Sequence, residues 1–515
     1  MILSQLGGIF ATVLALGGSI LVHEFGHYWA ARRLGLCVFR FSIGFGPRLF
    51  SWQRGETEFC LSALPIGGYV ALPQMEIGPP PPPLCPIDPW KRCATAAMGP
   101  LANLALALAL ASGLWILGQP LAPGDRNCTV GALAPALGEI WQGDPDAVPC
   151  EGDRILAVDG VPLDRLGDLS LRVALGTALD GEGQPIARLR VERNGQILDL
   201  AVPVLRHGHP GGPSRSLRSL PVFPAQPTVV RSVLPRSPAE LAGLAPGDEI
   251  LACGGIPVHS PTQLQQILDR IEKTGGPVDL ELRRQGIRKT LPILPAAGVE
   301  IFGHLRARLG RNVSIFLPGT EPGTWLPATG KKIPRTRQEL EAKFQEVEEV
   351  PPQLRFAIGV ALDQIFILEH GNPFRTVGRC IGETAHTLRA LISPRSDVHV
   401  RHLMGVAGMA RTLHRLSLDD IRGLLHFAMA INVGLALLNL LPIPALDGGH
   451  ICLALLGKIF PLPERLVRRL HGCCLLLLLA LLAHVTVLDL FRWREDSRAR
   501  ALGRELATLR RTPQF

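Results

Sequence analysis

No CxxC pair occurs among the 11 cysteines of this 515-residue chain. Zinc ribbons and disulfide frameworks depend on closely and regularly spaced cysteines, so neither kind of module is indicated. Cys128 and Cys150 flank one segment and would form a bridge if that segment faced an oxidising compartment. The alternative, a pair of free buried thiols, stays open at this point.

The sequence also has no basic helix interleaved with aromatic residues, although its net charge is +9. A nucleic-acid-binding surface is therefore not indicated, and no nucleic-acid partner is expected. The arginines lie instead beside apolar blocks, as Arg32 and Arg33 do. Together with a mean hydropathy of +0.23, this arrangement favours a membrane protein that carries polar domains.

A basic segment is likewise missing before the first apolar block, where a removable leader would have one. That block also contains two histidines and a glutamate, which a leader is not expected to carry. Crossing a bilayer takes about 20 helical residues. Four apolar blocks reach or nearly reach that length, and they cover residues 6–31, 94–118, 424–443 and 470–491.

The third apolar block breaks at Pro442 and Pro444, which have no backbone N–H with which to continue a helix. Broken backbone at membrane depth persists only where protein or a water-filled cavity satisfies its polar groups. Residues 439–450 are therefore a candidate functional site, whatever their side chains.

The loops between the apolar blocks predict an orientation, because short loops rich in lysine and arginine face the cytoplasm. Loops 32–93 and 457–469 have this composition, so residues 119–423 are expected on the opposite side. The basic tail 492–515 conflicts with this scheme, because the alternation of spans would place it outside as well.

The segment 119–423 contains an internal repeat, in which residues 152–162 recur as residues 247–257. Each copy begins with Gly-Asp and predicts a turn, a short strand and a second turn. The pattern resembles PDZ domains, which we expect at 119–210 and 222–298. PDZ domains add a peptide strand to a sheet edge, so binding of peptide tails and simple steric gating are both open roles.

The chemistry is indicated by His23-Glu24-Phe25-Gly26-His27, an HExxH sequence inside the first apolar block. Positions i and i+4 share a helix face, so both imidazoles can bind one ion while Glu24 assists a water molecule. Ionisable groups inside an apolar block are costly and by default functional. The alternative is a helix end at the membrane surface with snorkelling polar groups.

Catalytic zinc takes three protein ligands and keeps a fourth position open, so a third ligand is needed. A carboxylate is an acceptable partner of two histidines, and Asp447 precedes two glycines that permit close backbone approach. His450 is its chief rival, whereas His471 and His484 are expected to be interfacial or packed residues.

These motifs resemble the site-2 protease family of intramembrane metalloproteases, and in particular its bacterial regulator-of-sigma-E type. In chain order they are HEFGH at 23–27, FSIGFGP at 41–47, PIGGYV at 65–70, MGPLAN at 98–103, the PDZ-like repeat, and NLLPIPALDGGH at 439–450. The resemblance leaves out 299–354 and the C-terminal tail. The sequence departs from the family pattern at Met404-Gly405-Val406, where the family leads us to expect a Gly-Pro pair.

The resemblance implies that one Zn²⁺ is bound by His23, His27 and Asp447, with Glu24 as the catalytic base. It also implies that Asn439 and the turn containing Pro442 and Pro444 hold the substrate. The stretch 38–50 resembles the family's membrane-associated β-loop, which pairs with an extended substrate. The substrate contacts expected there are Ser42, Ile43, Gly44, Phe45 and Gly46.

The expected fold is a polytopic α-helical membrane protein with about four transmembrane helices, a membrane-associated β-loop and two PDZ-like α+β domains. We expect it in the inner (cytoplasmic) membrane, with the PDZ-like domains on the periplasmic side. Its expected partners are the lipid bilayer and single-span membrane substrates, such as a trimmed anti-sigma factor or a remnant signal peptide. The expected parts are 1–118 (two spans, HExxH and β-loop), 119–210 and 222–298 (PDZ-like), 299–423 (connection with amphipathic helices), 424–491 (two spans and LDG motif) and 492–515 (basic tail).

Two other functions are compatible with parts of the sequence. A non-catalytic membrane scaffold or chaperone would use the PDZ-like domains to bind exposed tails, but the intact HExxH and Asp447 argue against it. A transporter or channel would use the intramembrane polar residues as an ion path, but no inverted repeat is evident and the spans are too few.

Overall fold

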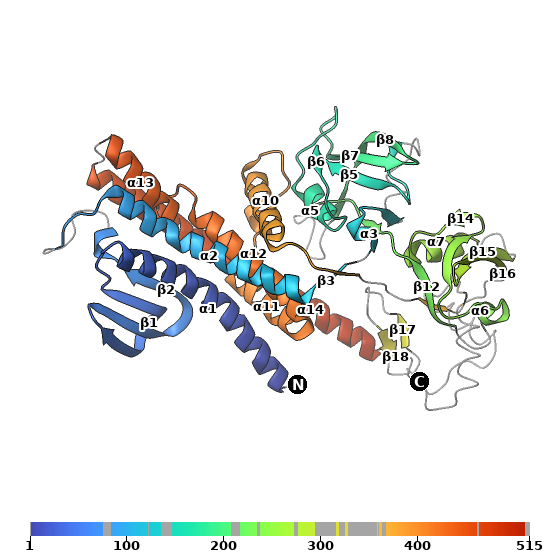
Figure 1. The fold of residues 1–515 in the computed structure, drawn as a ribbon, viewed down its shortest axis with the longest axis horizontal. Coiled ribbons are helices and arrows are strands. Elements are labelled where there is room, and N and C mark those ends of the chain that lie inside the picture. The colour runs from blue at the N-terminus through green and yellow to red at the C-terminus, as the bar shows by residue number, and fades with distance from the viewer. Residues whose placement is uncertain are drawn as a thin grey trace. The chain divides into compact units, whose positions relative to one another are not determined.

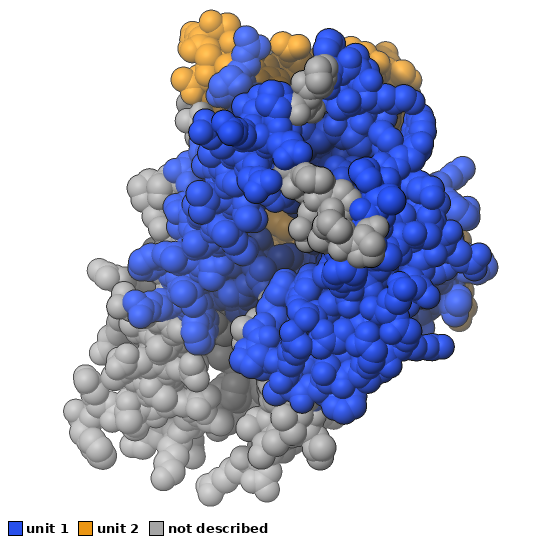
Figure 2. Space-filling model, turned by 90° about the vertical axis from the view of Figure 1, so that its left-hand side faces the viewer, with its two compact units in different colours: residues 1–119, 368–497 blue, residues 120–367, 498–515 orange. Residues whose placement is uncertain are grey.

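The computed structural model of the chain forms two compact units, which Figure 2 shows in different colours. The first unit comprises residues 1–119 and 368–497, and the second comprises residues 120–367 and 498–515. The proline run 79–83, most of 299–354 and the last six residues lie outside the described part. The structure describes residues 2–75, 84–121, 123–134, 147–207, 217–233, 237–271, 277–293, 316–318, 325–327, 358, 360–362, 367–460 and 463–509.

The first unit is mainly helical (Figure 1). Its helices are α1 (Ile2–Arg33), α2 (Pro89–Leu117), α10 (Pro373–Ile392), α11 (Val406–Asp419), α12 (Ile421–Asn439), α13 (Asp447–Ile459) and the part of α14 (Glu464–Leu509) up to residue 497, with short 3₁₀ turns at Pro73–Met75 and Val400–His402. Among the described residues, three helical segments are long and apolar enough to cross a membrane, namely Pro89–Leu117, Ile421–Asn439 and Glu464–Arg494. A count of four spans stays a prediction.

Local sequence sets the ends of these helices. Asp88 caps α2, because its carboxylate accepts a hydrogen bond of 2.7 Å from the Trp90 N–H, and a proline follows at the first helical position. α12 ends at Asn439, three residues before the first proline of the turn that follows it. α14 continues to Leu509, so the predicted basic tail from 492 begins inside this helix.

α2 is the central element of the helical unit and packs against α1, α12 and α13 (Figure 1). Ala107 and Ala111 of α2 are buried against Met429 and Val433 of α12. Small side chains let membrane helices approach closely, where hydrocarbon burial alone gives little association energy. A polar contact adds to this packing where the Asn432 amide of α12 donates to the Ser19 hydroxyl of α1 over 2.8 Å.

A sheet lies between α1 and α2 in the sequence, and it consists of β1 (Arg40–Arg54) and β2 (Thr57–Ala71). The two strands form a hairpin that bends so that the start of β1 lies between the two halves of β2. Residues 40–43 pair with residues 68–71 on one side and with residues 58–61 on the other. The sheet thus has residues 40–43 in its interior and residues 68–71 at one edge.

The second unit contains two domains that share the repeated Gly-Asp sequence. The first has β4 (Val130–Leu133), β5 (Arg154–Val158), β6 (Val161–Pro162), α5 (Asp168–Leu175), β7 (Ile186–Arg193), β8 (Gln196–Pro203) and β11 (Val222–Pro224). Its sheet has the order β6-β5-β7-β8, with β4 and β11 as a separate pair. Short strands also occur at Gln119–Leu121 (β3), Leu205–His207 (β9) and Leu217–Ser219 (β10), with a helical turn at Pro123–Arg126 (α3).

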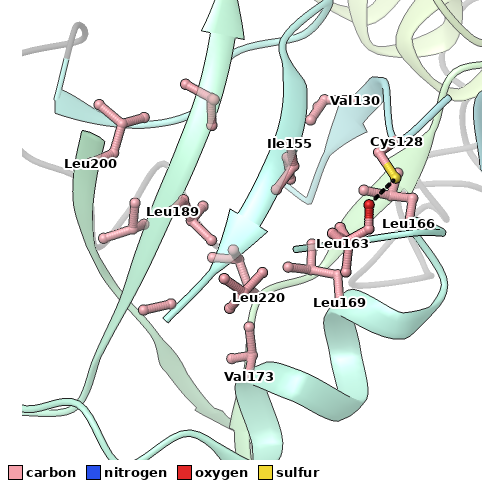
Figure 3. Packing of buried hydrophobic residues seen from close by; sticks show 14 of the residues in the cluster. Cys128, Val130, Ile155, Leu163, Leu166, Leu169, Val173, Leu189, Leu200 and Leu220 are labelled. Carbon is pink, nitrogen blue, oxygen red and sulfur yellow. Dashed lines mark hydrogen bonds between the residues drawn. The ribbon is translucent and has the colours of Figure 1, made fainter. Parts of the chain in front are cut away.

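Figure 3 shows the core of the first domain, where Ile155, Leu189 and Leu220 are almost fully buried. Cys128 lies at the edge of this core and its thiol donates to the carbonyl oxygen of Leu163. No disulfide joins Cys128 to Cys150 in the described part of the chain. Burial raises the pKa of the Cys128 thiol to about 11, so this side chain is neutral at physiological pH.

The second domain has a similar order of strands and helices, and its sheet also includes a strand that is distant in the sequence. It contains β12 (Thr228–Val233), α6 (Pro238–Leu241), β13 (Glu249–Cys253), β14 (Ile256–Pro257), α7 (Pro261–Ile271), β15 (Val278–Arg284) and β16 (Ile287–Ile293). The sheet order is β16-β15-β13-β12-β19, where β19 is Val360–Leu362. Ile358, just before β19, is buried in the core of this domain. Further short strands are β17 (Phe316–Pro318), β18 (Trp325–Pro327) and β20 (Ile367–Glu369).

The repeated Gly-Asp sequence builds the same ion pair in both domains. Asp153 receives two hydrogen bonds of 2.9 Å from Arg193, which lies on β7. Asp248 receives two of 2.6 Å from Arg284, which lies on β15. Both aspartates are almost fully buried. A bidentate pair of this kind fixes the turn to a strand that is distant in sequence.

The Asp248–Arg284 pair predicts that the second domain loses stability in acid. Burial would raise the pKa of Asp248, but hydrogen bonds from Arg284 and from the Ala245 N–H outweigh it, so the pKa lies below its ordinary value. The folded state therefore gains stability above the unfolded pKa of about 4 and loses it as pH falls through the lower folded pKa. Hydrogen exchange of β13 amides in the full-length protein should show this loss of protection.

Arg284→Gln tests the same pair at neutral pH, where it should cost about 3–5 kcal/mol in the opening free energy of β13. Arg283→Gln is the matched control, because Arg283 lies on the same strand β15, is 49% exposed and forms a surface ion pair with Glu249 of β13. We expect a much smaller effect from that control, because exposed ion pairs contribute little to stability. Equal effects of the two variants would contradict a special role for the buried pair.

Candidate metal centre and active site

The HExxH residues lie on α1, and the helix directs both histidines to the same side. The His23 and His27 rings are 4.8 Å apart between centroids, and their Nε2 atoms are separated by 3.2 Å. Both residues are only 9% exposed. The four-residue spacing on one helix face accounts for this convergence.

Asp447 completes the cluster from the other end of the chain. It is the first residue of α13, directly after the proline-containing turn. Its carboxylate oxygens lie 3.2 Å from His23 Nε2 and 3.4 Å from His27 Nε2. One ligand atom from each of the three residues lies within 4.8 Å of the others.

In each histidine, the Nδ1 atom, which is not the nitrogen that faces the cluster, has a polar partner on another part of the chain. His27 Nδ1 is 2.8 Å from the carbonyl oxygen of Thr95, which can only accept, so Nδ1 carries the proton. His23 Nδ1 is 3.3 Å from the side-chain amide of Asn103 on α2. Turning that amide by 180° brings its Oδ1 atom, which has no other partner, toward a protonated His23 Nδ1. Such partners orient metal-ligating histidines.

These contacts make the cluster fit a zinc ion. With protons on both Nδ1 atoms, two Nε2 lone pairs and a carboxylate converge on one point, and only a cation satisfies three acceptors. Asp447 Oδ2 is buried and has no hydrogen-bond partner. A Cβ on Gly99 would lie 2.3 Å from His27 Nε2, so glycine keeps this point clear. Two histidines and a carboxylate are an established donor set for catalytic zinc.

The other histidines considered as third ligands are not part of the described cluster. The His450 ring lies 6.0 Å from that of His471. His471 Nδ1 is 2.8 Å from the Pro444 carbonyl oxygen, and His484 is exposed on α14. Asp447 is the candidate that the fold brings to His23 and His27.

Glu24 lies next to the cluster and beside the β2 edge. A Cβ on Gly68 would be 3.5 Å from Glu24 Cγ and 2.8 Å from the Ser42 carbonyl oxygen, which shows how closely strand and helix approach. Asn439 ends α12 and is half-buried. The roles of Glu24 and Asn439, and of the turn after Asn439, stay predictions.

Comparison with known proteins identifies the family. The profile of peptidase family M50 matches residues 11–481. The chain belongs to peptidase family M50. The regulator of sigma-E protease RseP of Escherichia coli is 28% identical over 495 residues, which cover 90% of this chain and 94% of that protein.

Two further relatives carry the name putative zinc metalloprotease. That of Xylella fastidiosa is 28% identical over 87% of this chain and 90% of its own length. That of Neisseria meningitidis is 26% identical over 86% of this chain and 89% of its own length. The predicted family, the zinc cofactor and the metalloprotease activity are therefore confirmed. The M50 chain is an intramembrane zinc metalloprotease.

Three residues of this site were not predicted from the sequence: Thr95, Gly99 and Asn103. Gly99 and Asn103 belong to the MGPLAN motif, which served only to support the family resemblance. A polar Asn103 within an apolar block was the available signal. Thr95 contributes a backbone carbonyl, which leaves no trace in residue identity.

Proposed function

We propose that this protein is a multi-pass protease of the inner membrane that cuts a peptide bond in the transmembrane segment of a single-span protein. In this proposal α1 is a fourth span, and the PDZ-like domains lie on the periplasmic side. The observation that carries it is the convergence of His23, His27 and Asp447. Two of these residues end the apolar stretch of α1, and the third follows the apolar helix α12.

The proposed substrate class follows from the relatives. One of them is named for regulation of sigma-E, which fits an anti-sigma factor that has lost most of its outer domain. A remnant signal peptide has the same form, namely one apolar segment with a short tail. Either substrate presents a helix whose carbonyls are hydrogen-bonded and must be freed before hydrolysis.

The reaction assigns a separate task to each side chain. A zinc ion supplies Lewis-acid chemistry, polarising the scissile carbonyl and making a water molecule more acidic. Glu24 takes the proton of the attacking water and passes it to the leaving amine. Thr95 and Asn103 hold the two imidazoles in the tautomer that presents Nε2. The amide of Asn439 donates to a carbonyl of the extended substrate.

The substrate strand is proposed to pair with the β2 edge at residues 68–71. Within the described sheet, residues 68–71 pair with residues 40–43 on one side and with no strand on the other. Gly68 in this segment also lies beside Glu24. A strand added at this edge would replace the hydrogen bonds that the substrate helix loses. The substrate contacts predicted from the sequence lie on β1, the strand next to this edge, at Ser42, Ile43, Gly44, Phe45 and Gly46. Ser42 and Ile43 already pair with segments of β2 on both sides.

The test is cleavage of a model single-span substrate by the purified full-length protein in lipid vesicles. We expect cleavage within the apolar segment, and loss of cleavage when a zinc chelator is added. A version of the substrate with a folded outer domain should be cut much more slowly if the PDZ-like domains restrict access. Equal cleavage of both versions would remove the gating role, and cleavage of soluble unfolded protein alone would contradict the proposal.

A further inference from the structure

The turn that carries Asp447 has few hydrogen bonds of its own. It follows α12 and contains two prolines, which donate none. Within the turn, the Ile443 N–H donates to the Leu441 carbonyl over 2.7 Å and the Leu446 N–H donates to the Ile443 carbonyl over 2.8 Å. Further backbone bonds join its ends to α12, from the Leu441 N–H to the Leu438 carbonyl, and to α13, from the Gly449 and His450 N–H groups to the Leu446 carbonyl. The middle of the turn, around Pro444, is fixed by a contact from a third helix.

His471 supplies a contact from another helix. Its Nδ1 atom lies 2.8 Å from the carbonyl oxygen of Pro444, three residues before Asp447. Because a carbonyl only accepts, Nδ1–H is the donor, and the ring binds the turn rather than joining the metal cluster. A carbonyl left without a hydrogen-bond partner inside a bilayer is costly, so this contact would stabilise the turn.

α14 is otherwise little covered by protein. Only 11% of its most apolar stretch is buried, compared with 28% for α2 and 33% for α12. At its far end, Asp489 accepts from the Gly408 N–H over 2.8 Å and Arg492 donates to the Leu403 carbonyl over 2.8 Å. The His471 contact is thus a polar attachment of α14 at the end near Asp447.

We propose that His471 is a positioning residue of the metal centre: by holding the Pro444 carbonyl, it fixes the turn that places the Asp447 carboxylate opposite His23 and His27. The inference rests on the assignment of Asp447 as a zinc ligand. It gives α14 a part in zinc binding although the described ligand cluster contains no residue of α14. It also separates His471 from His450, its neighbour, which lies on α13 with Asp447.

The experiment compares three variants of the full-length protein. His471→Ala removes the donor, His471→Asn keeps an N–H close to the Nδ1 position, and His471→Gln moves the N–H toward the Nε2 position. His484→Ala is the matched control, because it removes an exposed imidazole from the same helix. Zinc affinity is measured by competition with a chelator, and kcat and KM are measured separately with the single-span substrate.

We expect His471→Ala to bind zinc about 10–100-fold more weakly, the usual cost of losing a residue that orients a ligand. The kcat should fall while KM changes little, and His471→Asn should recover most of the zinc affinity when His471→Gln does not. Wild-type affinity in His471→Ala, or no recovery in His471→Asn, would overturn the inference. Asp447→Ala measured alongside shows whether the ligand assignment itself fails.

Discussion

Glu24→Gln is expected to lower the turnover number about 10²–10⁴-fold while zinc stays bound, because general base catalysis contributes that much. Glutamine keeps the size and a hydrogen-bonding oxygen but cannot take a proton from water. Glu24 is not among the three residues whose ligand atoms converge, so its replacement leaves the donor set complete. KM should change far less than kcat.

The measurement is cleavage of the single-span substrate in vesicles, with zinc content determined on the same preparation. Glu56→Gln is the matched control, because Glu56 is exposed near the tip of the β1–β2 hairpin. We expect wild-type turnover from it. Full cleavage by Glu24→Gln would show that another group is the base, whatever the zinc content.

Asp447→Ala is expected to lose zinc and, with it, activity. Two histidines remain, but the carboxylate whose oxygens lie 3.2 and 3.4 Å from their Nε2 atoms is gone. The loss of zinc affinity should exceed the roughly 10–100-fold that follows from removal of an orienting residue. Zinc content after dialysis and the cleavage rate should fall together.

His450→Ala is the control for Asp447→Ala, because His450 lies three residues later on the same helix and outside the ligand cluster. We expect it to retain stoichiometric zinc and to lose much less activity. The reverse ranking of the two variants would identify His450 as the ligand. Loss of zinc from both to the same degree would point to unfolding of α13 instead.

The sequence predicted the parts of the site that depend on short spacing. HExxH converges because a helix returns to the same face after four residues, and Asp447 was a candidate because it follows a proline-broken apolar block. The support for the histidines could not be predicted in the same way. The carbonyl of Thr95 leaves no trace in residue identity, and Asn103, although a polar residue in an apolar block, has no pattern that assigns it to His23 before α2 packs on α1.

In the fold as well, features set by neighbouring residues could be predicted, whereas features set by residues distant in the sequence could not. The repeat predicted two similar domains because each copy carries its own turn and strand signals. The strand β19 was not foreseen, because three residues from a long connection carry too weak a pattern to indicate their partner. The sequence predicted a span that ends at residue 491 and a separate tail from residue 492, because the chain changes there from apolar to basic residues. The helix α14 continues through this point, because the basic residues are also good helix formers.

The separation of the three proposed zinc ligands along the chain has a consequence for biosynthesis. His23 and His27 leave the ribosome early, whereas Asp447 emerges only after residues 120–367 of the second unit have been made. A growing chain that has not yet reached Asp447 therefore holds two imidazoles without their carboxylate and cannot yet assemble the centre. The order of synthesis therefore delays assembly of this proposed centre until residues 120–367 have been made.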